Sequence, residues 1–217
     1  TIPLCQPLGC LVADGYAAEM EYPLDEISVE HSLQQFSKVY EKYLKESGST
    51  VFATVVPDKS YYLAEDNGYL SMDYEKMFSM VQEGMPWATH VDISDCLRIE
   101  DYYFTDTHWR QESLLPVAQR LSQAMGLTLP QEEDFTVTAL ERPFYGVYYG
   151  QAALPMKPDT MYLMENSLLD GCKVYSFEKD AYSSIYNREK LTGKDMYEVY
   201  LSGPEALLRV ENPNAAT

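Results

Sequence analysis

Apolar residues recur at two different spacings along the first 126 positions of the chain. Around Asp14-Gly15 they alternate with polar residues, which predicts a β-hairpin with its turn at this dipeptide. Farther on, apolar positions three and four residues apart predict amphipathic helices. Gly48 and Gly126 are expected to end two of these helices. The elements expected here are a hairpin at 11–22 and helices at 28–48, 74–83 and 113–126, the first and last capped by Ser28 and Ser113.

Between these helices lie two segments that we expect to be buried strands, a short apolar and β-branched run at 51–56 and the segment at 89–94. Strands that are apolar on both faces are typical of a parallel sheet covered by helices. Because strands and helices alternate, the first 126 residues predict an α/β layered fold with a largely parallel sheet. Beyond them, strand-like segments separated by Gly, Pro and Asp predict a β-rich insertion at 134–178. The expected strands are 135–140, 161–164 and 173–177, followed by a short helix near 195–201 and a strand at 207–210 that return to the α/β core.

Composition limits the possible partners. The 217 residues, 46% of them hydrophobic, are enough for a single α/β domain over 1–217. Asp and Glu outnumber Lys and Arg by 34 to 16, so the net charge of −18 disfavours nucleic acid and anionic bilayers as partners. No apolar run is long enough to span a membrane.

The four cysteines, at positions 5, 10, 96 and 172, show no CxxC pair and no Cys/His cluster. We therefore expect no structural zinc site and no metal cofactor. Cys5 and Cys10 are close enough in sequence to form a disulfide if the protein is exported. The alternative is that these cysteines are small apolar residues of the core.

The strongest candidate for chemistry is the tetrapeptide Asp106-Thr-His-Trp109. In an extended segment, residues two positions apart face the same side, with Cα atoms about 6.6–7 Å apart. The Asp106 carboxylate can then accept a hydrogen bond from Nδ1 of His108, which leaves Nε2 as a general base. These would be two members of a hydrolase triad whose serine no local spacing identifies. The alternative for such a bare Asp-x-His pattern is a solvated turn.

A family resemblance strengthens this interpretation. Tyr102-Tyr-Phe-Thr-Asp-Thr-His-Trp109 resembles the signature of the bacterial DHHW protein family and that of the SGNH-hydrolase-like domains of alginate O-acetylation proteins. Val55-Val-Pro-Asp-Lys-Ser60 precedes this motif and Tyr200-Leu-Ser-Gly203 and Leu207-Leu-Arg-Val210 follow it, in the order of the family. The resemblance implies a three-layer α/β/α fold with permuted element order.

Within the resemblance, Asp106 matches the orienting acid and His108 the general base. The family's serine follows the region that matches 207–214, and this sequence ends at Thr217. We therefore expect the chain to be incomplete at its C-terminus, or to be a member that has lost the serine. Inside the chain, Ser183, Ser184 and Ser202 lie near turns, but none sits in a strand–turn–helix elbow.

The resemblance implies an extracytoplasmic O-acetyltransferase or acetylesterase that acts on cell-surface polysaccharide without a cofactor. It also implies an N-terminal anchor absent from this sequence and a membrane-bound O-acyltransferase as partner. The alternative function is a non-catalytic polysaccharide-binding or scaffold module. A weaker third idea is a metal-dependent hydrolase that uses His90 and Asp92 with the Asp106–His108 pair, although a hydrogen-bonded His90 in the protein interior is favoured. His31 is expected on a helix surface.

Four further residues are candidates for substrate binding. Lys59 follows a predicted strand and could bind an anionic sugar or an oxyanion, or be a solvated loop lysine. Trp109 could stack on a sugar or anchor the following helix. Of Tyr102 and Tyr103, we expect one to be packed and the other to face the cleft. An incomplete sheet would expose a strand edge, so we also expect a homodimer or a C-terminal segment that covers this edge.

Overall fold

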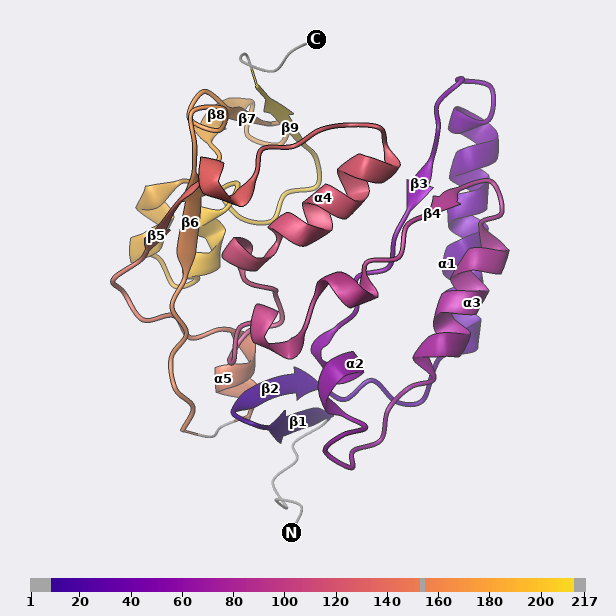
Figure 1. Ribbon diagram of the computed structural model, residues 1–217, viewed down its shortest axis with the longest axis horizontal. Helices are drawn as coiled ribbons and strands as arrows, with labels where there is room; N and C mark the ends of the chain where they lie inside the picture. Colours follow the sequence, from indigo (N-terminus) through magenta and orange to yellow (C-terminus); the bar gives the residue numbers. More distant parts are fainter. Residues whose placement is uncertain (1–8, 153–154, 213–217) are drawn as a thin grey trace. The chain divides into compact units, whose positions relative to one another are not determined.

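The computed structural model describes residues 9–152 and 155–212, and it shows a mixed α/β protein with small sheets (Figure 1). The chain divides into two compact units. Unit 1 is Thr1–Leu129 with Val147–Lys157, and unit 2 is Pro130–Gly146 with Pro158–Thr217. The predicted three-layer arrangement and the single domain over 1–217 stay predictions. No helix among the described residues is both long and apolar enough to cross a bilayer.

Unit 1 begins with the predicted hairpin. Asp14 and Gly15 form a two-residue turn between Ala13 and Tyr16, with φ angles of 51° and 88°. Positive φ at both central positions is the conformation that tight hairpins require. The α-helices and strands of unit 1 are β1 (Cys10–Ala13), β2 (Tyr16–Glu19), α1 (Glu26–Val39), β3 (Phe52–Ala53), α2 (Lys59–Leu63), α3 (Tyr74–Gly84), β4 (Thr89–His90), α4 (Leu115–Ala124) and α5 (Val147–Ala152), and a π-helical turn at Tyr40–Leu44 continues α1.

The helix boundaries follow local hydrogen bonding. α1 begins earlier than predicted, because the Asp25 carboxylate accepts the backbone N–H of Ser28 at 3.0 Å and so caps the helix. α3 matches its prediction to within one residue. α4 is not capped by Ser113, which lies in a preceding 3₁₀ turn. Gly126 follows α4 with a φ of 72°, as expected for a residue that ends a helix.

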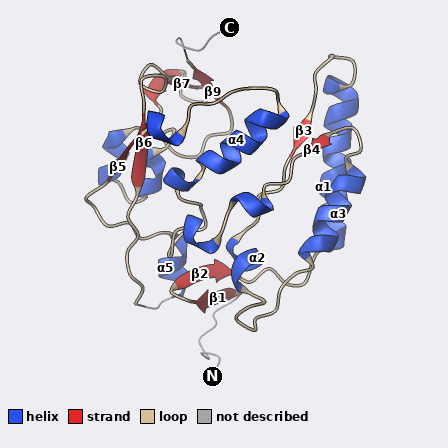
Figure 2. Ribbon diagram, viewed as in Figure 1, coloured by secondary structure: helices blue, strands red, loops and turns tan. Residues whose placement is uncertain are grey.

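The predicted parallel pairing is present but short. β3 and β4 pair in parallel over two residues each, Phe52 with Thr89 and Ala53 with His90 (Figure 2). Beyond β4 the Asp92 carboxylate accepts the N–H of Ser94 at 2.9 Å, and this turn prevents the strand from continuing. Among the described residues β3 pairs with β4 alone.

Unit 2 contains the predicted strands in two antiparallel sheets. β5 (Thr136–Ala139) pairs with β6 (Tyr162–Glu165). β7 (Lys173–Ser176) lies between β8 (Ala181–Ser184), which was not predicted, and β9 (Leu208–Glu211).

Three expectations about this half of the chain are corrected. The β-rich region extends past 178 to β9, and the segment Val147–Lys157 inside it belongs to unit 1. The strand expected at 207–210 exists, but it pairs with β7 rather than returning to the α/β core. The short helix near 195–201 is a 3₁₀ turn at Met196–Val199.

The core of unit 1 positions the segment that carries Asp106 and His108. The β1–β2 hairpin contacts both α2 and α5 (Figure 1). An apolar cluster lies where β4, α4 and the segment before Asp106 meet. It consists of Val91, Ile93, Leu97, Tyr102 and Val117. The Asp106 segment is therefore held by buried apolar side chains and is no free surface loop.

Candidate active site

Residues 102–109 form a loop that closes on itself. Tyr102 and Trp109 are bridged in antiparallel fashion, and the N–H of Tyr103 donates to the carbonyl of His108 at 3.2 Å. Between these ends, Thr105 and Asp106 are buried, whereas Thr107 and His108 are exposed. The loop thus presents a buried acid and an exposed imidazole from neighbouring positions.

The Asp106 carboxylate and the His108 ring are in direct contact. Nδ1 of His108 lies 2.5 Å from Oδ1 of Asp106, and the backbone N–H of His108 donates to the same oxygen at 3.0 Å. The Asp106 side chain is 4% exposed and that of His108 is 43% exposed. In a neutral ring whose Nδ1–H donates to the carboxylate, Nε2 carries the lone pair that can accept a proton. The hydrogen bond predicted from the sequence is present, and the alternative of a solvated turn does not fit a buried Asp106.

A third contact to Asp106 comes from a helix that sequence reasoning missed. The backbone N–H of Val147, the first residue of α5, donates to Oδ2 of Asp106 at 3.1 Å. The next N–H, of Tyr148, donates to the carbonyl of Thr105 at 2.9 Å. Burial opposes ionisation of Asp106, but the hydrogen bonds from the His108 ring and from the two backbone N–H groups outweigh it and lower its pKa. The acid is therefore an ionised acceptor held from both sides.

This contact predicts a pH-dependent effect of Val147→Pro. Because the pKa of Asp106 is lowered in the folded chain, its carboxylate stabilises the fold at neutral pH, and this contribution disappears as the pH falls below about 4. Proline removes the N–H but suits the first position of a helix. We expect the free energy of unfolding at pH 7 to fall by about 1.5–3 kcal/mol, the value of a hydrogen bond to a charged group.

The measurement is thermal unfolding of Val147→Pro between pH 7 and pH 2. The difference in Tm from the wild type should be largest at neutral pH and should shrink as Asp106 becomes protonated in both proteins. Val147→Ala keeps the N–H and serves as the matched control. A deficit that is the same at every pH would show that the proline acts on α5 alone and not through Asp106.

Lys59 approaches the same loop from inside the protein. Its side chain is 2% exposed, so the alternative of a solvated loop lysine is wrong. Nζ donates to the carbonyls of Tyr103 at 2.8 Å and Phe104 at 3.3 Å, and it lies 4.9 Å from the ring centre of Tyr148. The ammonium thus holds the two residues that precede Thr105-Asp106, and its contact with a substrate stays a prediction.

The residues around Lys59 explain why two distant sequence segments belong together. The carbonyl of Pro57 accepts the hydroxyl of Tyr102 at 2.5 Å. The Asp58 carboxylate caps α2 through the N–H of Ser60 at 2.7 Å and also accepts the hydroxyl of Tyr74 at 2.8 Å. Residues 57–60 therefore contact the loop at 102–109 and hold it in position.

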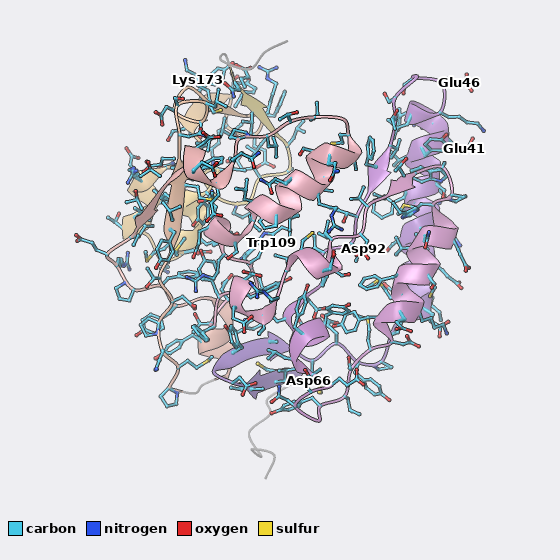
Figure 3. The ribbon with its side chains drawn as sticks, in the orientation of Figure 1. Glu41, Glu46, Asp66, Asp92, Trp109 and Lys173 are labelled. Carbon is cyan, nitrogen blue, oxygen red and sulfur yellow. The ribbon has the colours of Figure 1, made fainter. Side chains whose placement is uncertain are left out.

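The aromatic candidates do not line an open cleft. The rings of both Tyr102 and Tyr103 are buried, so the expectation that one of them faces a cleft is wrong. Tyr102 contributes its ring to the cluster of Val91 and Val117, which is why it cannot turn outward. Trp109 packs against the same cluster beside α4 (Figure 3), in keeping with the anchoring role considered for it. Stacking of Trp109 on a sugar stays a prediction.

The remaining candidates lie apart from this pair. Nε2 of His90 lies 2.9 Å from the carbonyl of Met85, and Asp92 bonds to Ser94, so each has its own local partner. Within the described residues, no three His, Cys, Asp or Glu side chains converge as a metal site would require. His31 is exposed on α1, as expected. Cys5 lies outside the described residues, so its disulfide with Cys10 stays a prediction.

The internal serines belong to unit 2. Ser183 and Ser184 are part of β8, and the hydroxyl of Ser202 donates to that of Ser183 at 3.0 Å. None of the three begins a helix after a strand, the geometry in which hydrolases present a nucleophilic serine. The structure thus locates these serines in the β7–β8 region and not in a strand–turn–helix elbow.

Comparison with known proteins identifies the fold. No protein-family model and no curated protein matches the chain. A DHHW family protein from Eubacterium siraeum DSM 15702 matches with a TM-score of 0.76 and 20% identity over 97% of this chain and 73% of that one. Bacillus cereus PatB1 with a sulfonyl adduct matches with a TM-score of 0.68 and 14% identity over 95% and 75%, and a second PatB1 structure with 0.65 and 15% over 95% and 76%. The chain therefore has the fold of a DHHW family protein and of PatB1.

Proposed function

We propose that this chain carries the acid–base pair of an SGNH-like O-acetyltransferase or acetylesterase. The observation that supports it most is the 2.5 Å contact between Oδ1 of Asp106 and Nδ1 of His108, with the acid buried and the imidazole exposed. Such a pair accepts a proton on Nε2 and stabilises the positive charge that then develops on the ring. This is the task of a general base that activates a hydroxyl nucleophile.

In the proposed reaction, Nε2 of His108 removes the proton of a serine hydroxyl as the serine oxygen attacks an acetyl ester. Asp106 keeps the ring oriented and stabilises the imidazolium. His108 then returns the proton to the leaving alcohol, and an acetyl-serine remains. A sugar hydroxyl or water, deprotonated by His108, releases the acetyl group in the second half. In the family that the sequence resembles, the serine follows the region that matches 207–214.

The structural neighbours support a nucleophile on this fold. Sulfonyl reagents form covalent adducts with activated hydroxyl or thiol groups, and a sulfonyl adduct is present in one PatB1 structure. A protein with this fold can therefore present a reactive nucleophile. For the present chain we propose an acceptor among cell-surface polysaccharides, a location outside the cytoplasm, and a membrane-bound O-acyltransferase as the source of acetyl groups.

The test uses the protein at its natural length. We expect it to release acetate from 4-nitrophenyl acetate and to lose this activity when treated with phenylmethylsulfonyl fluoride. Mass spectrometry should show one sulfonyl group per protein, attached to a serine. A folded protein that neither cleaves the ester nor takes up the sulfonyl group would contradict the proposal and favour a non-catalytic module.

A further inference from the structure

One face of the β8–β7–β9 sheet in unit 2 gathers aromatic rings. Along β7 and the residue after it, Val174 and Ser176 are buried, while Tyr175 and Phe177 point to the opposite face. Tyr182 of β8 and Arg209 of β9 are the cross-strand partners of Tyr175 on either side. We call these four residues (Tyr175, Phe177, Tyr182 and Arg209) the aromatic face; Figure 3 labels Lys173 at the start of β7.

The rings of the aromatic face are held by one another and by the strands. The ring centre of Tyr175 lies 4.9 Å from that of Phe177 and 5.0 Å from that of Tyr182. The Tyr175 hydroxyl donates to the carboxylate of Asp180 in the β7–β8 turn. Backbone pairing and ring contacts already fix these side chains, so the side chains would lose little conformational entropy when a ligand binds. Phe177 and Tyr182 are nevertheless 47% and 55% exposed, so both rings are accessible to a ligand.

The face carries one cation, Arg209, next to two carboxylates, those of Asp180 and Glu211. The guanidinium of Arg209 lies 5.2 Å from the ring centre of Tyr175 and 5.7 Å from that of Phe177. It also forms an ion pair with Glu211 at 2.7 Å. On a chain with a net charge of −18, this face pairs its cation with an adjacent anion. Because the guanidinium is already paired and the Asp180 carboxylate adds a negative charge, this face disfavours polyanions and matches an uncharged ligand.

We propose that the aromatic face binds an uncharged polysaccharide. Pyranose rings have apolar C–H faces that stack on aromatic side chains, and their hydroxyl groups bond to planar charged groups such as guanidinium and carboxylate. The face offers Phe177 and Tyr182 for stacking, with Arg209 and Glu211 as donor and acceptor at its side. The inference goes beyond the proposed function, because it concerns a binding surface in unit 2 and involves neither Asp106 nor His108.

The experiment measures binding of cellohexaose, chitohexaose and hexagalacturonate by titration calorimetry, with the full natural chain. We expect one or both neutral hexasaccharides to bind and the anionic one to bind more weakly. Loss of a stacking ring from such a platform costs about tenfold in affinity, so Phe177→Ala/Tyr182→Ala should weaken binding about a hundredfold. Arg209→Lys keeps the charge but not the planar group and should weaken it several-fold.

Two control variants show whether binding belongs to the aromatic face. Tyr43→Ala removes an exposed tyrosine of unit 1 that also has a neighbouring cation, Lys42, and it should leave binding unchanged. His108→Ala should also bind normally, so failure of the proposed ester chemistry would not affect this result. The inference is overturned if the wild type binds neither neutral sugar, if the folded double variant binds as well as the wild type, or if hexagalacturonate binds best. It is also overturned if the face proves to be a dimer contact that the double variant breaks.

Discussion

His108→Ala is expected to lower kcat for ester cleavage by about 10³- to 10⁴-fold in the full natural protein. The substitution removes the group that takes the serine proton, and no second histidine among the described residues bonds to the Asp106 carboxylate. The measurement is release of 4-nitrophenol and acetate under saturating substrate. KM should change little, because alanine removes the general base and not a binding surface.

His31→Ala is the matched control for this prediction. His31 is exposed on α1, where its ring contacts the side chain of Gln35 at 3.2 Å. It should keep the wild-type rate. If His108→Ala keeps more than a tenth of the activity while remaining folded, the imidazole is not the general base, and the proposed mechanism is wrong.

Lys59→Met is expected to have the largest effect on stability. Each hydrogen bond from the ammonium to a buried carbonyl contributes about 1.5–3 kcal/mol, and Lys59 makes two of them. The Phe104 carbonyl keeps a second donor, the N–H of Ala17 at 2.9 Å, and methionine gains some apolar contact. We therefore expect a net loss of about 3 kcal/mol in the free energy of unfolding, which lowers Tm by about 6–12 °C.

Thermal unfolding and ester cleavage should be measured together on Lys59→Met. Because Tyr103 and Phe104 lead directly to Thr105-Asp106, activity should fall even where the variant is fully folded. Lys45→Met removes an exposed lysine that forms a surface ion pair with Glu41 at 2.8 Å, and it should leave Tm and activity unchanged. Equal Tm values for the two variants would show that the buried ammonium does not hold the loop.

Features encoded within a few residues could be predicted from the sequence. The Asp14-Gly15 turn, the extent of α3 and the end of α4 depend on local backbone preferences, and the structure contains all three. The Asp106–His108 contact belongs to the same class, since two positions separate its members. Sequence patterns of this kind depend on local backbone geometry. The features they encode can therefore be predicted without knowledge of the rest of the fold.

Features that join distant segments could not be predicted in the same way. Val147 reaches Asp106 across 41 positions, and Lys59 reaches Tyr103 across 44. Hydrophobic periodicity shows which face of an element is buried but not which loop it meets, so Lys59 could be taken for a surface residue. One signal did exist. The segments at 55–60 and 102–109 both belong to the family resemblance, and the structure shows them in contact.

The closed loop at 102–109 has a consequence for how the protein assembles. Contacts between residues close in sequence cost little chain entropy and form quickly, whereas β3 and β4 must bring together segments far apart along the chain. Closure of the loop at 102–109, which brings Asp106 and His108 together, therefore costs less chain entropy than the pairing of β3 with β4. Lys59 and α5 add contacts from distant parts of the chain, and these contacts fix the geometry of the loop.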